Sequence, residues 1–138
     1  MYEQRVQRAM EPMCRKDIEA TMRAFADDAI FELAGHTELS GRYVGREAIE
    51  GLFRRIFDGL ETIRFRVRHV ALTNPLGFTY TNTIFVESEV EETSRDGVTI
   101  VDQRIAVYEY RHGKVVSIRE WPFYPTVIEA IWPRGLIR

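Results

Sequence analysis

Carboxylates and one arginine recur on three consecutive segments in which hydrophobic and polar residues alternate. Glu87 and Glu89 lie on the first segment, Asp102 and Arg104 on the second, and Glu120 on the third. Carboxyl groups in an apolar pocket can act as general acids and bases, because the loss of water raises their pKa toward neutrality. An arginine among them would keep one acid ionised and orient it. These residues could therefore transfer protons to and from a small molecule.

Whether these side chains meet depends on how the segments pair as strands. We expect a two-residue type I′ loop at Asp96-Gly97, which pairs Glu89 with Arg104 and keeps residues of like character on one face. The polar face of this pair is then expected to hold Phe85, Glu87, Glu89, Asp102, Arg104 and Tyr108. The apolar face is expected to hold Ile84, Val86, Val90, Val101, Ile105 and Val107.

Two loops are possible for the next hairpin. A three-residue loop with Gly113 in the left-handed position pairs Arg104 with Glu120, whereas a two-residue His112-Gly113 loop puts Arg119 and Trp121 on the polar face. We favour the first, because a bulge of this kind requires a glycine. Arg104 is then expected within salt-bridge reach of Glu89 or Glu120.

The polar face has two interpretations. A charged strand face is usually solvated and an apolar one usually forms the core. Alternatively, the charged face is concave and lines a cavity, an arrangement that the aromatic side chains of Phe85, Tyr108 and Tyr110 beside carboxylates would suit. In that case the apolar face meets a second copy of the chain, and we expect a homodimer.

The elements before these strands are predicted to be helical. Apolar residues at helical spacing run from residue 2 to 14, with Pro12 bending or ending that helix near Glu11, and Asp17 is expected to cap the next helix. A short strand is expected at 29–33, a loop at 35–45 and a third helix at 46–60. Strands are expected from residue 61 onward and at 78–91, 98–110 and 114–124. Three helices followed by an antiparallel meander predict an α+β fold, in which a bent sheet forms a cone around the helices.

Composition limits the classes of function. The 138 residues suit one domain, residues 1–138, and 19 basic against 21 acidic residues argue against a nucleic-acid partner. One cysteine, Cys14, excludes an internal disulfide, and three histidines without ligand spacing predict no metal. No apolar run is long enough for a membrane span and no signal peptide is evident, so we expect a cytoplasmic protein with no membrane partner. No organic cofactor is implied.

Several short motifs resemble one known group of proteins. They are residues 17–20 (DIEA), 25–29 (FADDA), 41–49 (GRYVGREAI), 85–89 (FVESE), 113–115 (GKV) and 119–121 (REW). In this order they resemble the SnoaL-like branch of the NTF2-like superfamily, which includes ketosteroid isomerase, polyketide cyclases and limonene-epoxide hydrolase. The resemblance covers about residues 5 to 125. It implies the cone-shaped fold and a small hydrophobic molecule as ligand.

The family's catalytic residues carry over only in part. Ketosteroid isomerase uses a tyrosine and an acid in its oxyanion hole and an aspartate as its general base. The resemblance places these three positions at Ala9, Ala106 and Leu33, which have no polar side chain. It therefore does not imply the steroid isomerase mechanism. The resemblance matches Glu120 to an acid on the last strand of limonene-epoxide hydrolase. That enzyme uses a set of two aspartates and one arginine in its pocket. The resemblance also matches Glu87 to a glutamate common in SnoaL-like members.

We therefore expect a small-molecule enzyme of isomerase, cyclase, dehydratase or epoxide hydrolase type. Its acid and base would be Glu87 or Glu120, with Arg104 holding one of them ionised. Residues expected to contact substrate or border the pocket are Phe85, Glu89, Asp102, Tyr108, Tyr43 and His36. The alternative is a non-catalytic ligand-binding or dimeric association module with the same fold.

Overall fold

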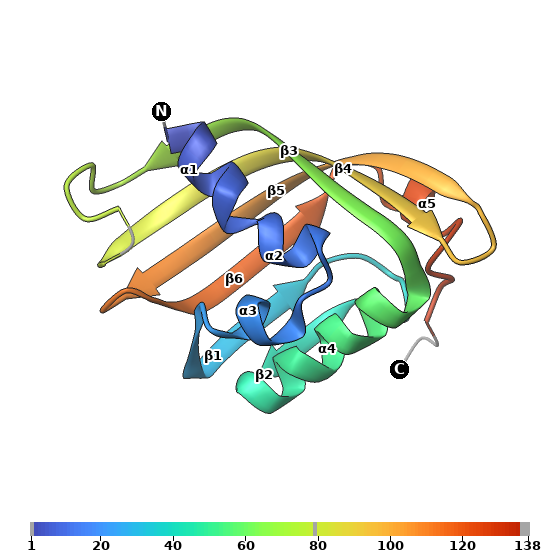
Figure 1. Cartoon of the computed structure of the whole chain (residues 1–138), viewed down its shortest axis with the longest axis horizontal. Coiled ribbons are helices and arrows are strands. Elements are labelled where there is room, and N and C mark those ends of the chain that lie inside the picture. The colour runs from blue at the N-terminus through green and yellow to red at the C-terminus, as the bar shows by residue number, and fades with distance from the viewer. Residues whose placement is uncertain (1, 79, 136–138) are drawn as a thin grey trace.

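The computed structural model describes residues 2–78 and 80–135, and six strands in it form one curved sheet (Figure 1). The order across the sheet is β2-β1-β6-β5-β4-β3. Strand β1 pairs with β6 in parallel, and each of the other neighbouring pairs is antiparallel. The strands are β1 (Phe25–Leu33), β2 (Gly41–Val44), β3 (Leu60–Leu72), β4 (Asn82–Ser94), β5 (Thr99–Arg111) and β6 (Lys114–Pro122).

Four helices lie against one side of this sheet (Figure 1). They are α1 (Tyr2–Ala9), α2 (Glu11–Cys14), α3 (Ile18–Met22) and α4 (Arg46–Gly59), and a short α5 (Pro125–Ile128) follows the last strand. The predicted break at Pro12 separates α1 from α2, and the Asp17 side chain caps α3 by accepting a hydrogen bond from the backbone N–H of Ala20. The predicted α+β fold is confirmed. Among the described residues, no helix is long and apolar enough to cross a membrane.

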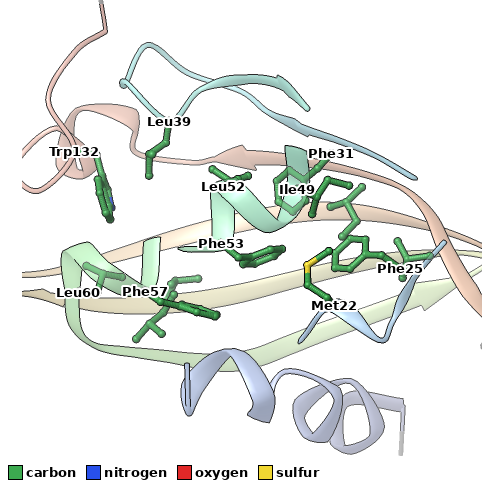
Figure 2. Close-up of a cluster of buried hydrophobic side chains, with 14 of the residues drawn as sticks. Met22, Phe25, Phe31, Leu39, Ile49, Leu52, Phe53, Phe57, Leu60 and Trp132 are labelled. Atoms are coloured by element: carbon green, nitrogen blue, oxygen red, sulfur yellow. The ribbon is translucent and has the colours of Figure 1, made fainter. Parts of the chain in front are cut away.

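Two apolar clusters fill the concave side of the sheet. The larger one is built on the inner stripe of α4, where Ile49, Leu52, Phe53 and Phe57 are buried (Figure 2). The smaller one joins α1 to β4 through the buried side chains Val6, Met10, Ile84 and Val86. The spacing of these residues along their helices and strand puts them on one face of each element.

The β4–β5 hairpin does not have the predicted register. The last strand pair is Thr93 with Thr99, and beyond it the backbone N–H of Ser94 donates to the carbonyl oxygen of Val98 at 2.8 Å. This leaves a three-residue loop, Arg95-Asp96-Gly97, with Gly97 at φ +91°. The Arg95 side chain leaves the strand to donate hydrogen bonds to the carbonyl oxygens of Phe57 and Asp58, at the C-terminal end of α4, at 3.2 and 3.1 Å. The last carbonyl oxygens of a helix have no partner within the helix and accept such hydrogen bonds. The contact between Arg95 and α4 therefore favours the three-residue loop over the predicted two-residue loop.

This one-residue shift turns β4 over relative to the prediction, because successive strand side chains point to opposite faces. The concave face of the pair carries Ile84, Val86, Ser88, Val90 and Glu92 from β4 and Asp102, Arg104, Ala106 and Tyr108 from β5. Phe85, Glu87 and Glu89 lie on the convex face instead. The predicted apolar face is thereby divided, since Ile84, Val86 and Val90 belong to the core while Val101 and Ile105 are exposed on the convex side.

The β5–β6 hairpin combines features of both predicted loops. Its turn is the two-residue His112-Gly113 loop, with both residues at positive φ, and Arg111 pairs with Lys114. A register shift follows between Glu109 and Tyr110, and beyond it Ala106 pairs with Glu120. The favoured three-residue loop is wrong, but the bulge returns Glu120 to the concave face that holds Arg104.

Residues 35–45 are not entirely loop. Residues 41–44 form β2, which pairs with β1 from Ile30 with Val44 to Leu33 with Gly41. The short sheet-edge strand has no buried residue, so it lacks the apolar alternation that would predict it. The strand predicted at 29–33 begins earlier, at Phe25, immediately beyond α3.

Candidate active site

One arginine bonds three carboxyl groups at one end of the concave face. The Arg104 side chain donates from NH2 to Glu92 at 2.6 Å, from Nε to Asp102 at 3.3 Å and from NH1 to Glu120 at 3.4 Å. Each nitrogen of the guanidinium thus serves a different acid, a use of its planar fork that a lysine could not reproduce. Burial by itself would lower the pKa of Arg104, but the negative charges of Glu92, Glu120 and Asp102 outweigh it and raise that pKa. Arg104 is therefore a permanent cation.

Two of the three acids also hold the segment that follows β6. The Trp132 indole Nε1 donates to Glu92 at 3.4 Å, and the backbone N–H of Tyr124 donates to Asp102 at 3.2 Å. The side chains of Glu92 and Asp102 are 3% and 0% exposed. Each oxygen of these two side chains therefore accepts a hydrogen bond from a donor within the protein.

Glu120 differs from them in its contacts and its exposure. One of its oxygens accepts from Arg104, and no other hydrogen bond to its side chain is formed by the described residues. Burial raises the pKa of Glu120, Arg104 opposes the shift, and the charges of Glu92 and Asp102 add to it. Burial therefore favours the protonated form of Glu120, and its one donor, Arg104, opposes that effect.

An apolar cavity lies in front of this group. The centre of a water molecule can occupy about 160 Å³ of it, a volume on the scale of an engineered cavity of about 150 Å³ that binds benzene. Glu92, Arg104 and Glu120 form part of its wall, whereas Asp102 does not line it. Aromatic and aliphatic walls are supplied by Phe25, Phe31, Phe53, Phe57, Ile63 and Phe65.

Tyr108 and Tyr110 continue the wall along β5. Burial raises the pKa of both phenols, and the nearby charge of Glu120 adds to the shift at Tyr108. Both hydroxyl groups are therefore neutral across the physiological range and can donate hydrogen bonds. The predicted position of Tyr108 in the pocket agrees with the structure.

The three β4 residues expected in the pocket lie on the outer surface. Glu87 pairs with His69 at 2.9 Å, Glu89 with Arg68 at 3.8 Å, and Phe85 is 43% exposed. The predicted contact of Arg104 with Glu120 is confirmed, whereas the contact with Glu89 is wrong. The physical reason is the three-residue loop at Arg95, which places these side chains on the convex face.

The structure separates the two site residues that were expected in the 35–45 loop, His36 and Tyr43. His36 is exposed and belongs to the cavity wall, so it lies at the rim as expected. The Tyr43 hydroxyl donates to the carbonyl oxygen of Leu39 at 2.7 Å and secures the loop between β1 and β2. Tyr43 packs against the larger cluster rather than lining the cavity.

Two residues of the site, Glu92 and Trp132, were not predicted from the sequence. Glu92 continues the even-numbered series of Val86 and Val90, which would have marked it as inward-facing once the register was known. Trp132 reaches the site from beyond the last strand, and a Cβ on Gly59 would lie 2.5 Å from its ring atom Cη2. The small residue at the end of α4 therefore makes room for the indole. Within the described ranges, no group of three potential metal-ligating side chains is placed to hold an ion.

The fold and this site define a class. A curved sheet around N-terminal helices is the architecture of NTF2-like proteins. The chain belongs to the SnoaL-like domain family, whose model matches residues 6–118. No curated protein matches the chain in sequence.

Solved structures share this fold at low sequence identity. Bal32a, from a soil-derived mobile gene cassette, has a TM-score of 0.77 and 20% identity, with 92% of each chain covered. A Catenulispora acidiphila protein with a ketosteroid isomerase-like fold, in complex with trimethylamine, has a TM-score of 0.72 and 13% identity over 94% of this chain and 92% of the other. TerC, co-crystallised with polyporic acid, has a TM-score of 0.71 and 17% identity over 89% and 91%. At these identities the similarity establishes the fold alone.

Proposed function

We propose that the protein is a small-molecule enzyme in which Glu120 is the general acid and base. The observation that carries this proposal is the unequal bonding of the three acids around Arg104. Glu92 and Asp102 are each held by two donors, whereas Glu120 has one donor and belongs to the wall of the cavity. A carboxyl group with a raised pKa beside an apolar cavity suits proton transfer near neutral pH.

The proton transfers follow from this arrangement. Protonated Glu120 donates its proton to an electronegative oxygen of the bound molecule, such as a carbonyl or epoxide oxygen. The carboxylate that remains is stabilised by the N–H of Arg104, and it then removes a proton from carbon or from water, which restores Glu120. Such a cycle serves isomerisation, cyclisation, dehydration or epoxide opening, and isomerases and cyclases are common in the SnoaL-like family.

A substrate screen tests this proposal. Small epoxides, enones and polyketide-like compounds are first ranked by thermal shift, and those that bind are assayed for turnover. We expect turnover of at least one of them, with a rate that falls as the pH rises through the raised pKa of Glu120, because the acid form is then lost. Ligands that bind without any turnover would favour a non-catalytic binding module of the same fold.

We also propose that the convex face associates with a second copy of the chain. Phe85, Val101, Ile105 and Trp121 are each between 42% and 48% exposed on this face, opposite the side covered by α1–α4 (Figure 1). Ile105 pairs with Trp121 across β5 and β6, so these two apolar side chains are adjacent. Apolar residues gathered on an uncovered sheet favour burial against a partner.

Sedimentation at tens of micromolar is expected to give a homodimer, and Ile105→Lys a monomer. A charge placed in an apolar interface would be buried without a partner. Leu76→Lys, in an exposed turn, is the matched control and should remain dimeric. A parent protein that sediments as a monomer at high micromolar concentration would contradict the proposal.

A further inference from the structure

The far half of the cavity contains hydroxyl groups that the proposed proton transfer does not use. Tyr108 and Tyr110 lie on β5 beyond Ala106, on the same concave face as Arg104. Both line the cavity, and neither hydroxyl has a hydrogen-bond partner among the described residues. The raised pKa values of both phenols keep them as donors. Both tyrosines are half-buried, and their hydroxyl groups are free to bond a molecule inside the cavity.

A third hydroxyl group lies in the same half. Thr21 is 6% exposed and belongs to the cavity wall, and its Oγ1 is buried without a hydrogen-bond partner in the described part of the chain. Thr21 precedes Phe25, the first residue of β1, by four residues. Phe25 pairs with Val115, and Val115 in turn pairs with Tyr110. The α3 end of the cavity therefore brings Thr21 toward the Tyr110 end of β5.

From these groups we infer a second polar subsite, formed by Tyr108 and Tyr110, which binds an oxygen of the substrate remote from the reacting one. Tyr108 and Tyr110 are two and four residues from Ala106, the partner of Glu120, which corresponds to about 7 and 13 Å along a strand. The substrate is then an elongated, mostly apolar molecule with an oxygen near each end. This inference rests on the proposed function for the reacting end only, since the tyrosine pair would bind such a molecule without any turnover.

A series of three naphthalene compounds tests the subsite by calorimetry. Naphthalene, 2-naphthol and 2,6-dihydroxynaphthalene share one apolar body and carry no, one and two hydroxyl groups. We expect the diol to bind about five- to tenfold more tightly than 2-naphthol. Its second hydroxyl group adds one hydrogen bond to the tyrosine pair, and one such bond provides a gain of this size. In the Tyr108→Phe/Tyr110→Phe double variant this ratio should fall below about twofold.

Control variants distinguish a loss of the tyrosine subsite from an effect of the proposed acid chemistry and from a loss of folding. Tyr124→Phe removes a hydroxyl from an exposed tyrosine outside the cavity wall and should keep the ratio. Glu87→Gln, on the convex face, should also keep it. Calorimetry measures binding without turnover, so a failure of the proposed chemistry would leave this result unchanged. A ratio that survives in the double tyrosine variant would overturn the inference, as would the absence of binding by all three compounds. Retained affinity for naphthalene itself shows that the double variant is folded.

Discussion

Arg104→Met is expected to lower the free energy of unfolding by about 3–5 kcal/mol at pH 8, the range observed when one partner of a buried ion pair is removed. The methionine fills similar space but leaves Glu92 and Asp102 charged and without their cation. At pH 5 the loss should be smaller, because Arg104 opposes the raised pKa of Glu120, and without it Glu120 takes up a proton more readily. Urea unfolding at the two pH values measures both effects.

Arg111→Met is the matched control for this change. Arg111 is exposed on the same strand, near the hairpin turn, and its replacement should change stability by less than about 0.5 kcal/mol. A loss below about 1 kcal/mol for Arg104→Met would mean that the three carboxyl groups do not depend on this guanidinium. The charge arrangement on which the site rests would then be wrong.

Glu120→Gln is expected to reduce turnover by about 10²–10⁴-fold while ligand binding is retained. Glutamine has nearly the same shape and can still bond Arg104 through its oxygen, but it cannot donate and recover a proton at this position. The measurement is turnover of a substrate from the screen, with thermal shift on the same ligand to report binding.

Glu87→Gln provides the comparison that separates the two faces of the sheet. Glu87 was the other acid expected from the sequence, but its carboxylate lies on the convex face beside His69. Its replacement should leave both turnover and binding near parent values. Loss of turnover in Glu87→Gln with normal activity in Glu120→Gln would reverse the assignment.

The elements were predictable because local signals determine them. Pro12, the Asp17 cap and the apolar stripe of α4 act within a few residues, and each predicted element occurs close to its expected place. The β4–β5 register was not predictable in this way. Asp96-Gly97 satisfies the rule for a two-residue turn, yet Arg95 is drawn out of the strand by carbonyl groups of α4, 37 and 38 residues away in sequence.

The site was therefore predicted in part. Arg104, Glu120, Tyr108 and His36 occupy the pocket as expected, because their placement depends on β5, β6 and one loop. Glu120 reached the correct face through a bulge that no residue type in the strand signals. Trp132 joins Glu92 from a segment 40 residues further along the chain, and no local pattern links the two.

The central claim is that Glu120 retains its proton above the ordinary range of a glutamate. Carbon-13 NMR of side-chain carboxyl groups, titrated from pH 3 to 9 in the parent and in Glu120→Gln, measures this directly. The account predicts one resonance, absent from the variant, whose midpoint lies above the ordinary glutamate pKa of 4.5. A midpoint at or below 4.5 for that resonance would contradict it, because Glu120 would then be a carboxylate at neutral pH with no proton to donate.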